Sequence, residues 1–287
     1  LANGLQIVAE CNEHAYSTAL GFFVKTGSRD EEPQVAGVSH FLEHMVFKGT
    51  SRRSAADVNR ELDEMGSQSN AYTSEEHTVY YGTVLPEYQS QMVELLADMM
   101  RPSLRLEDFE SEKKVIIEEI YKYDDQPPYG AAETCMEAFF GEHPLGNNIL
   151  GSVESVSAMS PDGMRDYFRL RYSPGNMHLV ACGNVDFEAL VATAEEHCGN
   201  WESFATHRDQ PDIPRNLGEQ RIEKSVATQE YTIQIADGPD ATDPLRFAYR
   251  LLAYVLGDDS GSRLYWSLVD PGLAEYAGVS PHEFDGA

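Results

Sequence analysis

Apolar and polar residues alternate along the first two thirds of the chain in patterns that predict both strands and helices. Short runs rich in β-branched and aromatic residues predict strands over residues 4–9, 18–25, 67–73, 78–85 and 177–183. Apolar residues at helical spacing predict helices over residues 35–47, 55–65, 86–100, 107–123, 161–170 and 186–198. A stretch rich in Pro and Gly, which contains QPPYG and HPLGNNILG, is expected to be looser in structure.

The last third of the chain repeats the order seen at its start. Residues 203–219 are polar, contain three chain breakers, and predict a linker. A strand (227–236), a breaker-rich turn and an apolar helix (246–257) follow. We therefore predict an α+β protein of two similar α/β units, each a mostly antiparallel sheet packed with helices. The units are residues 1–202 and 220–287, and the second is expected to be incomplete.

Composition excludes several classes of function. The net charge of −27 over 287 residues argues against binding to nucleic acid. No apolar run approaches the ~18 residues that a membrane span needs. The four cysteines are widely spaced, so they predict neither a disulfide framework nor a structural zinc cluster. Reduced thiols favour the cytoplasm slightly over the periplasm and leave the compartment open.

The segment HFLEHMVFKGT, residues 40–50, carries two histidines and a glutamate in an otherwise apolar helix. His40 and His44 lie one helical turn apart and can direct their rings at one metal ion, as tetrahedral zinc requires. Glu43 lies on the same face, where it can take a proton from a zinc-bound water. Histidine pairs on amphipathic helices are also commonly structural, and a short motif can occur by chance. Burial favours the metal, because buried polar groups need partners.

A third ligand is expected from the helix over 107–123. Its apolar face is centred on Phe109, Ile116 and Ile120. At about 100° per residue, Glu118 falls on the opposite, solvated face. Glu112 and Glu119, seven residues apart, lie together on the flank of the apolar stripe. We therefore predict Glu119 as the ligand and Glu112 as its supporting neighbour.

These motifs resemble the pitrilysin or insulinase family of metallopeptidases. HxxEH is the inverted zinc motif of the inverzincins, and here it is followed by the Glu112–Glu119 pair. The greatest similarity is to the mitochondrial processing peptidase beta subunit and its bacterial relatives. Further matching stretches are NAYTSEEHTVYY (70–81), HPLGNNILGS (143–152), RYSPGNM (171–177) and LVACGNV (179–185).

The resemblance implies roles for the residues of the motif. His40, His44 and Glu119 would bind one Zn²⁺ per chain, Glu43 would be the general base, and Glu112 would support the site. The implied activity is that of a zinc endopeptidase.

The resemblance also implies a substrate-binding strand. Residues Asn70, Ala71, Tyr72 and Thr73 match an edge strand that pairs with extended substrate, although an ordinary hairpin strand is the alternative. Phe47 matches a position that lines the pocket beside the scissile bond, and it is equally well explained as a core residue.

One part of the family pattern is missing. The family's second domain often carries an Arg and a Tyr, seven residues apart, that hold the substrate. The matching stretch SLVDPGLAEY (267–276) has Leu268 and Glu275 at those positions. This departure predicts that the chain needs a homologous half that carries the Arg/Tyr clamp. That half is either the partner in a homodimer or heterodimer or the rest of one longer chain.

The sequence is compatible with three functions. The leading one is a zinc endopeptidase that hydrolyses unfolded, extended peptides. The second is a metal-bound but non-catalytic structural or assembly subunit. The third is a peptide-binding module.

Overall fold

The computed structural model describes residues 1–211, 213 and 216–287, which divide into two compact units. Unit 1 comprises Leu1–Asp209 and Pro214–Tyr231, and unit 2 comprises Gln210–Ile213 and Thr232–Ala287. Within the predicted linker over 203–219, residues 212, 214 and 215 lie outside the described residues. The domain boundaries therefore stay a prediction.

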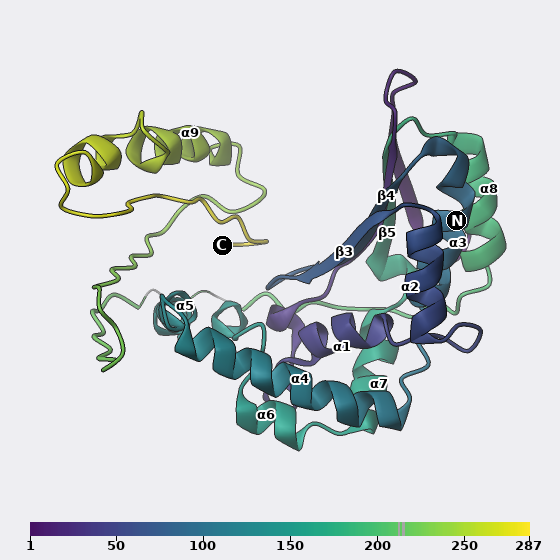
Figure 1. The fold of residues 1–287 in the computed structure, drawn as a ribbon, viewed down its shortest axis with the longest axis horizontal. Helices are drawn as coiled ribbons and strands as arrows, with labels where there is room; N and C mark the ends of the chain where they lie inside the picture. Colours follow the sequence, from purple (N-terminus) through teal and green to yellow (C-terminus); the bar gives the residue numbers. More distant parts are fainter. Residues whose placement is uncertain (212, 214–215) are drawn as a thin grey trace. The chain divides into compact units, whose positions relative to one another are not determined.

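Unit 1 is built around one mixed, mostly antiparallel sheet, as predicted (Figure 1). Its strand order is β1 (Gln6–Cys11), β5 (Met177–Gly183), β2 (Thr18–Val24), β4 (Thr78–Val84) and β3 (Gln68–Thr73). β1 and β5 are parallel, and the other pairs are antiparallel. β3 bonds to β4 alone, so it forms one edge of the sheet.

Helices cover both faces of this sheet (Figure 1). On one face lie α3 (Gln89–Met99) and α8 (Phe187–Cys198), which pack against each other. On the other face, α1 (Val38–Val46) packs against β3 and β4 and is backed by α4 (Leu106–Asp125) and α7 (Pro161–Arg171). The short α2 (Ala55–Glu64) contacts α3. This arrangement encloses α1 between the sheet and two further helices.

A buried carboxylate and a glycine fix the start of α1. Glu31 accepts hydrogen bonds from the backbone N–H groups of Gly37 (2.6 Å) and Ser39 (2.7 Å), which would otherwise be unsatisfied at a helix N-terminus. Gly37 has φ +89°, and a Cβ there would lie 2.5 Å from the carbonyl oxygen of Leu150. Only glycine satisfies both constraints without strain. Burial raises the pKa of Glu31 to about 8, although these hydrogen bonds act in the opposite direction.

The Pro- and Gly-rich stretch holds more regular structure than expected. It contains α5 (Ala131–Phe140), and α6 (Val153–Ala158) follows it directly. Ser152 caps α6 through a reciprocal pair of hydrogen bonds with Ser155. The stretch expected to be looser is therefore partly helical, because α5 itself contains no Gly or Pro and its flanking glycines, Gly130 and Gly141, lie at its two caps.

Unit 2 contains α9 (Arg246–Gly257), as predicted, and a single π-helical turn, η6 (Tyr265–Val269). The strand expected over 227–236 is absent from the part of the chain that the structure describes. An isolated strand has no partner for its backbone groups, so a pattern alone is insufficient to form one. None of the described helices is long and apolar enough to cross a membrane.

Candidate metal centre

Three potential metal ligands converge where α1 meets α4. The Nε2 atoms of His40 and His44 lie 3.7 and 3.6 Å from the same Oε2 atom of Glu119. One potential ligand atom from each residue lies within 4.8 Å of the others. Among the residues that the structure describes, this is the one His, Cys, Asp or Glu group with metal-binding geometry.

Packing between the two helices brings these residues together. Phe41 of α1 and Phe109 of α4 stack with ring centroids 4.7 Å apart, and both are fully buried. The helical spacing places His40 and His44 on one face of α1, with ring centroids 4.7 Å apart. Two turns beyond Glu112, the same face of α4 presents Glu119. Glu118 is exposed, in agreement with the orientation predicted from the helical wheel.

The donor set fits a zinc ion. Catalytic zinc sites use imidazole and carboxylate ligands at about 2.0–2.2 Å, which places neighbouring ligands of a tetrahedral shell about 3.4 Å apart. The observed separations of 3.6 and 3.7 Å are near that value and are longer than an ordinary hydrogen bond. Burial, with a smaller effect of His44, lowers the pKa of His40 to about 4. His40 is therefore neutral at pH 7, as a ligand must be.

Glu112 holds the ring of His44 from the side opposite the ligand group. Its Oε1 lies 2.9 Å from His44 Nδ1, and its Oε2 lies 2.5 Å from Lys48 Nζ. Burial opposes ionisation of Glu112, but the contacts with Lys48 and His44 outweigh it and lower its pKa. The sequence predicted the support from Glu112 but missed Lys48. The available signal was the position of Lys48, one helical turn after His44 in HFLEHMVFKGT.

Glu43 lies beside the ligand group and is held by the sheet. Its Oε2 accepts a hydrogen bond of 2.6 Å from the hydroxyl of Thr73 at the end of β3. Burial raises the pKa of Glu43, and this hydrogen bond acts in the opposite direction. Thr73 was predicted as a substrate-binding residue, and its contact with Glu43 was not anticipated.

The other predicted residues lie on or near the edge strand. Asn70 and Tyr72 are exposed and Ala71 is buried, as the alternation of a strand requires. Phe47 is half-buried and packs against the core, with its ring centroid 6.5 Å from that of Tyr80. This favours the core alternative for Phe47, and its role beside a substrate stays a prediction.

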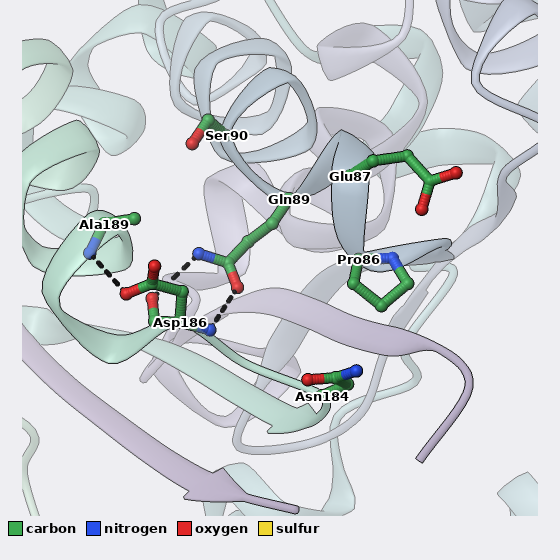
Figure 2. Close-up of a pocket in the computed structure, with 7 residues that line it drawn as sticks. All are labelled: Pro86, Glu87, Gln89, Ser90, Asn184, Asp186 and Ala189. Atoms are coloured by element: carbon green, nitrogen blue, oxygen red, sulfur yellow. Dashed lines mark hydrogen bonds between the residues drawn. The ribbon is translucent and has the colours of Figure 1, made fainter. Parts of the chain in front are cut away.

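A polar depression elsewhere in unit 1 has a structural explanation (Figure 2). Within it, the side chain of Gln89 bonds to the backbone N–H and C=O of Asp186, each at 2.9 Å. The carboxylate of Asp186 caps α8 by accepting from the N–H of Ala189 at 3.0 Å. Since these bonds join α3 to α8 and no ligand of the metal centre lines the depression, it belongs to the packing of the fold.

Comparison with known proteins agrees with the geometry of the centre. Residues 6–153 match the profile of the insulinase family, peptidase family M16, and residues 158–287 match that of the peptidase M16 inactive domain. The chain belongs to the M16 peptidase family. Nothing in the comparisons links it specifically to the processing peptidase beta subunit within that family.

Relatives in the family are named as zinc proteases. An uncharacterized zinc protease of Mycobacterium tuberculosis is 41% identical over 201 residues, which cover 70% of this chain and 46% of that protein. The uncharacterized zinc protease YmxG of Bacillus subtilis is 35% identical over 284 residues, covering 98% of this chain and 68% of that protein. The chain thus spans about half the length of the mycobacterial relative.

A solved structure shares the fold. The crystal structure of a protease from Helicobacter pylori superposes with a TM-score of 0.84 and 22% identity, covering 99% of this chain and 70% of that one. At this identity, the likeness supports the fold alone.

Proposed function

We propose that this protein is a zinc-dependent endopeptidase that hydrolyses extended, unfolded peptides. One observation carries the proposal: the side chains of His40, His44 and Glu119 converge on one point, with the carboxylate of Glu43 beside them. The zinc proteases among the relatives support it.

The three ligands would hold one zinc ion per chain. When bound, zinc acts as a Lewis acid and lowers the pKa of water at its open position to near 7. Glu43 would take a proton from the attacking water and then deliver it to the leaving amine. Thr73 bonds to Oε2 of Glu43, which would leave Oε1 for this transfer, since Oε1 has no hydrogen bond to the part of the chain that the structure describes. Glu112 would fix His44 in the orientation that directs Nε2 toward the centre.

The edge strand β3 would hold the substrate. Its outer side is unpaired in the sheet, so residues Asn70 to Thr73 can add an extended peptide by backbone hydrogen bonds. Thr73 ends this strand and contacts Glu43, so a peptide on β3 would run toward the general base. Edge pairing selects for extended backbone rather than for particular side chains, which fits unfolded substrates.

We also propose a processing-peptidase-like assembly with a homologous half that carries the Arg/Tyr clamp. Leu268 and Glu275 at the matching positions support this idea, since neither can replace the guanidinium or the phenol. Residues 1–202 would be the metal-bearing domain and 203–219 the linker, and residues 220–287 would belong to a second, homologous domain.

The proposal is tested by metal content and by hydrolysis of a quenched fluorescent peptide. The purified chain should bind one zinc, and cleavage should disappear with a chelator and in Glu43→Gln. The assay is run with the chain alone and with a zinc-less homologous partner from the same genome. One zinc per chain without Glu43-dependent cleavage, partner present, would instead favour a structural subunit. Peptide binding that a chelator leaves unchanged would favour a binding module.

A further inference from the structure

We infer that Lys48 is a positioning residue of the metal centre, which holds Glu112 so that Glu112 in turn orients His44. The inference rests on the proposed zinc site. It adds a residue outside the ligand set and the general base.

The contacts form a chain of three side chains. Lys48 Nζ lies 2.5 Å from Glu112 Oε2, and Glu112 Oε1 lies 2.9 Å from His44 Nδ1. A carboxylate oxygen can only accept a hydrogen bond, so Nδ1 of His44 carries the proton. The lone pair of His44 is then on Nε2, the atom that faces Glu119 at 3.6 Å. Each oxygen of Glu112 therefore has one partner, and its rotation is restricted from both ends.

Burial makes the second partner of Glu112 important. The Glu112 side chain is 6% exposed, and a carboxylate at such a position needs compensation for lost hydration. Lys48 is 34% exposed, so its ammonium group stays partly hydrated while it neutralises Glu112. Without Lys48, Oε2 would lose its partner, and Glu112 would be free to turn toward water. The hydrogen bond to His44 would then loosen.

The two histidines differ in how they are held. Nδ1 of His40 is buried and has no hydrogen-bond partner among the described residues. His40 is restrained by packing, since it is 8% exposed. His44 is more accessible, with a side chain that is 24% exposed, and it depends on Glu112 for its orientation. The Lys48–Glu112 pair thus acts on the ligand that packing restrains least.

The backbone places Lys48 for this role. It follows the end of α1, four residues after His44, and its carbonyl oxygen accepts a hydrogen bond from the guanidinium of Arg105. Arg105 is the residue at the start of α4, the helix that carries Glu112. Both ends of the ion pair are therefore fixed by the same α1–α4 junction that assembles the ligands.

The test measures zinc affinity, which is independent of catalysis, in the purified full chain. Loss of an outer partner of a metal ligand commonly lowers metal affinity by about 10–100-fold. Because Lys48 acts through Glu112, we expect Lys48→Met to weaken zinc binding about tenfold in competition with a chromophoric chelator. Lys48→Arg should restore binding to within about threefold. The visible spectrum of the cobalt-substituted Lys48→Met protein should shift, and that of Lys48→Arg should match the wild type.

Lys114 provides a matched control, since it is an exposed lysine on α4 without a role at the centre. Lys114→Met should bind zinc as the wild type does. The inference is overturned if Lys48→Met binds zinc within twofold of the wild type. It is also overturned if Lys48→Met lowers the unfolding temperature of the zinc-free protein and Lys48→Arg fails to restore zinc affinity. A wild-type chain that binds no zinc would instead overturn the proposed function itself.

Discussion

Two apolar helices of this chain, α1 and α9, have very different environments. In α1, seven of the nine residues are buried. In α9, only Ala253 and Gly257 of the twelve residues are buried, while Phe247 and Leu251 are 56% and 67% exposed. Both patterns correctly predicted a helix. Apolar spacing therefore specifies a helix, whereas the burial of that helix depends on the layers around it.

Polar side chains reveal the same contrast. In α1, His44 and Glu43 are hydrogen-bonded by residues of α4 and β3, and together with His40 they form a candidate reaction centre. In α9, the charged side chains are Arg246 and Arg250, and Arg250 forms a bidentate pair with Glu283. α9 therefore has charged anchors but no group that could transfer a proton at neutral pH. Four experiments test the difference between α1 and α9.

The largest expected effect is on catalysis. Glu43→Gln should lower peptide hydrolysis by about 10²–10⁴-fold, because the amide cannot accept the proton. Zinc content should be unchanged, since Glu43 is outside the ligand group. The paired change in α9, Arg250→Gln, should leave the rate within a few fold. Quenched-peptide hydrolysis and elemental analysis measure both. If the Glu43→Gln protein lost its zinc, Glu43 would have to be counted as a zinc ligand, which would contradict its proposed role as a separate base.

The second effect is on stability. Phe41→Ala should destabilise unit 1 by about 3–5 kcal/mol, since it removes a fully buried ring that stacks on Phe109. Phe247→Ala should change that stability by less than about 0.5 kcal/mol. Urea unfolding is followed through buried Trp201 in a Trp266→Phe background, because Trp266 belongs to unit 2. Equal losses in the two variants would remove the contrast between the helices.

The third effect is a dependence of stability on pH that arises from Glu31, the residue that caps α1. Burial raises the pKa of Glu31 from 4.5 to about 8 in the folded state. Its contribution to stability is therefore complete below about pH 4.5 and is lost as the pH rises through about 8. The urea midpoint of the wild type should fall between pH 5 and 8, and that of Glu31→Gln should fall less. If the midpoints of both proteins changed equally with pH, Glu31 would be ionised in the folded and the unfolded state alike.

The smallest effect concerns the anchor of α9. Arg250 is half exposed, so its pair with Glu283 is screened by water. Arg250→Ala should lower the free energy of unfolding of unit 2 by at most about 1 kcal/mol. Circular dichroism during urea unfolding at low and high salt measures the loss. A larger loss that persists at high salt would mean that α9 is held as firmly as α1.

Periodicity predicted the five strands of unit 1, most of its helices and the orientation of α4, because these follow from local spacing, but it missed α5 and α6. The wheel placed Glu119 inward and Glu118 outward, and their exposures agree. Lys48, Glu31 and the Thr73–Glu43 bond escaped prediction, because each contact joins residues that meet only after folding. The strand expected over 227–236 failed for the opposite reason: its residues suit a strand, but strand formation needs a neighbour.

The bond between Thr73 and Glu43 has a consequence for selectivity. Thr73 is the last residue of the edge strand and bonds directly to Glu43. If β3 holds the substrate and Glu43 is the base, as proposed, a peptide that distorts the strand would also displace the carboxylate. Fit along the backbone would then set the reaction rate, and substitutions in β3 should alter kcat and KM together. Under this proposal the edge of the sheet would select substrates as well as bind them.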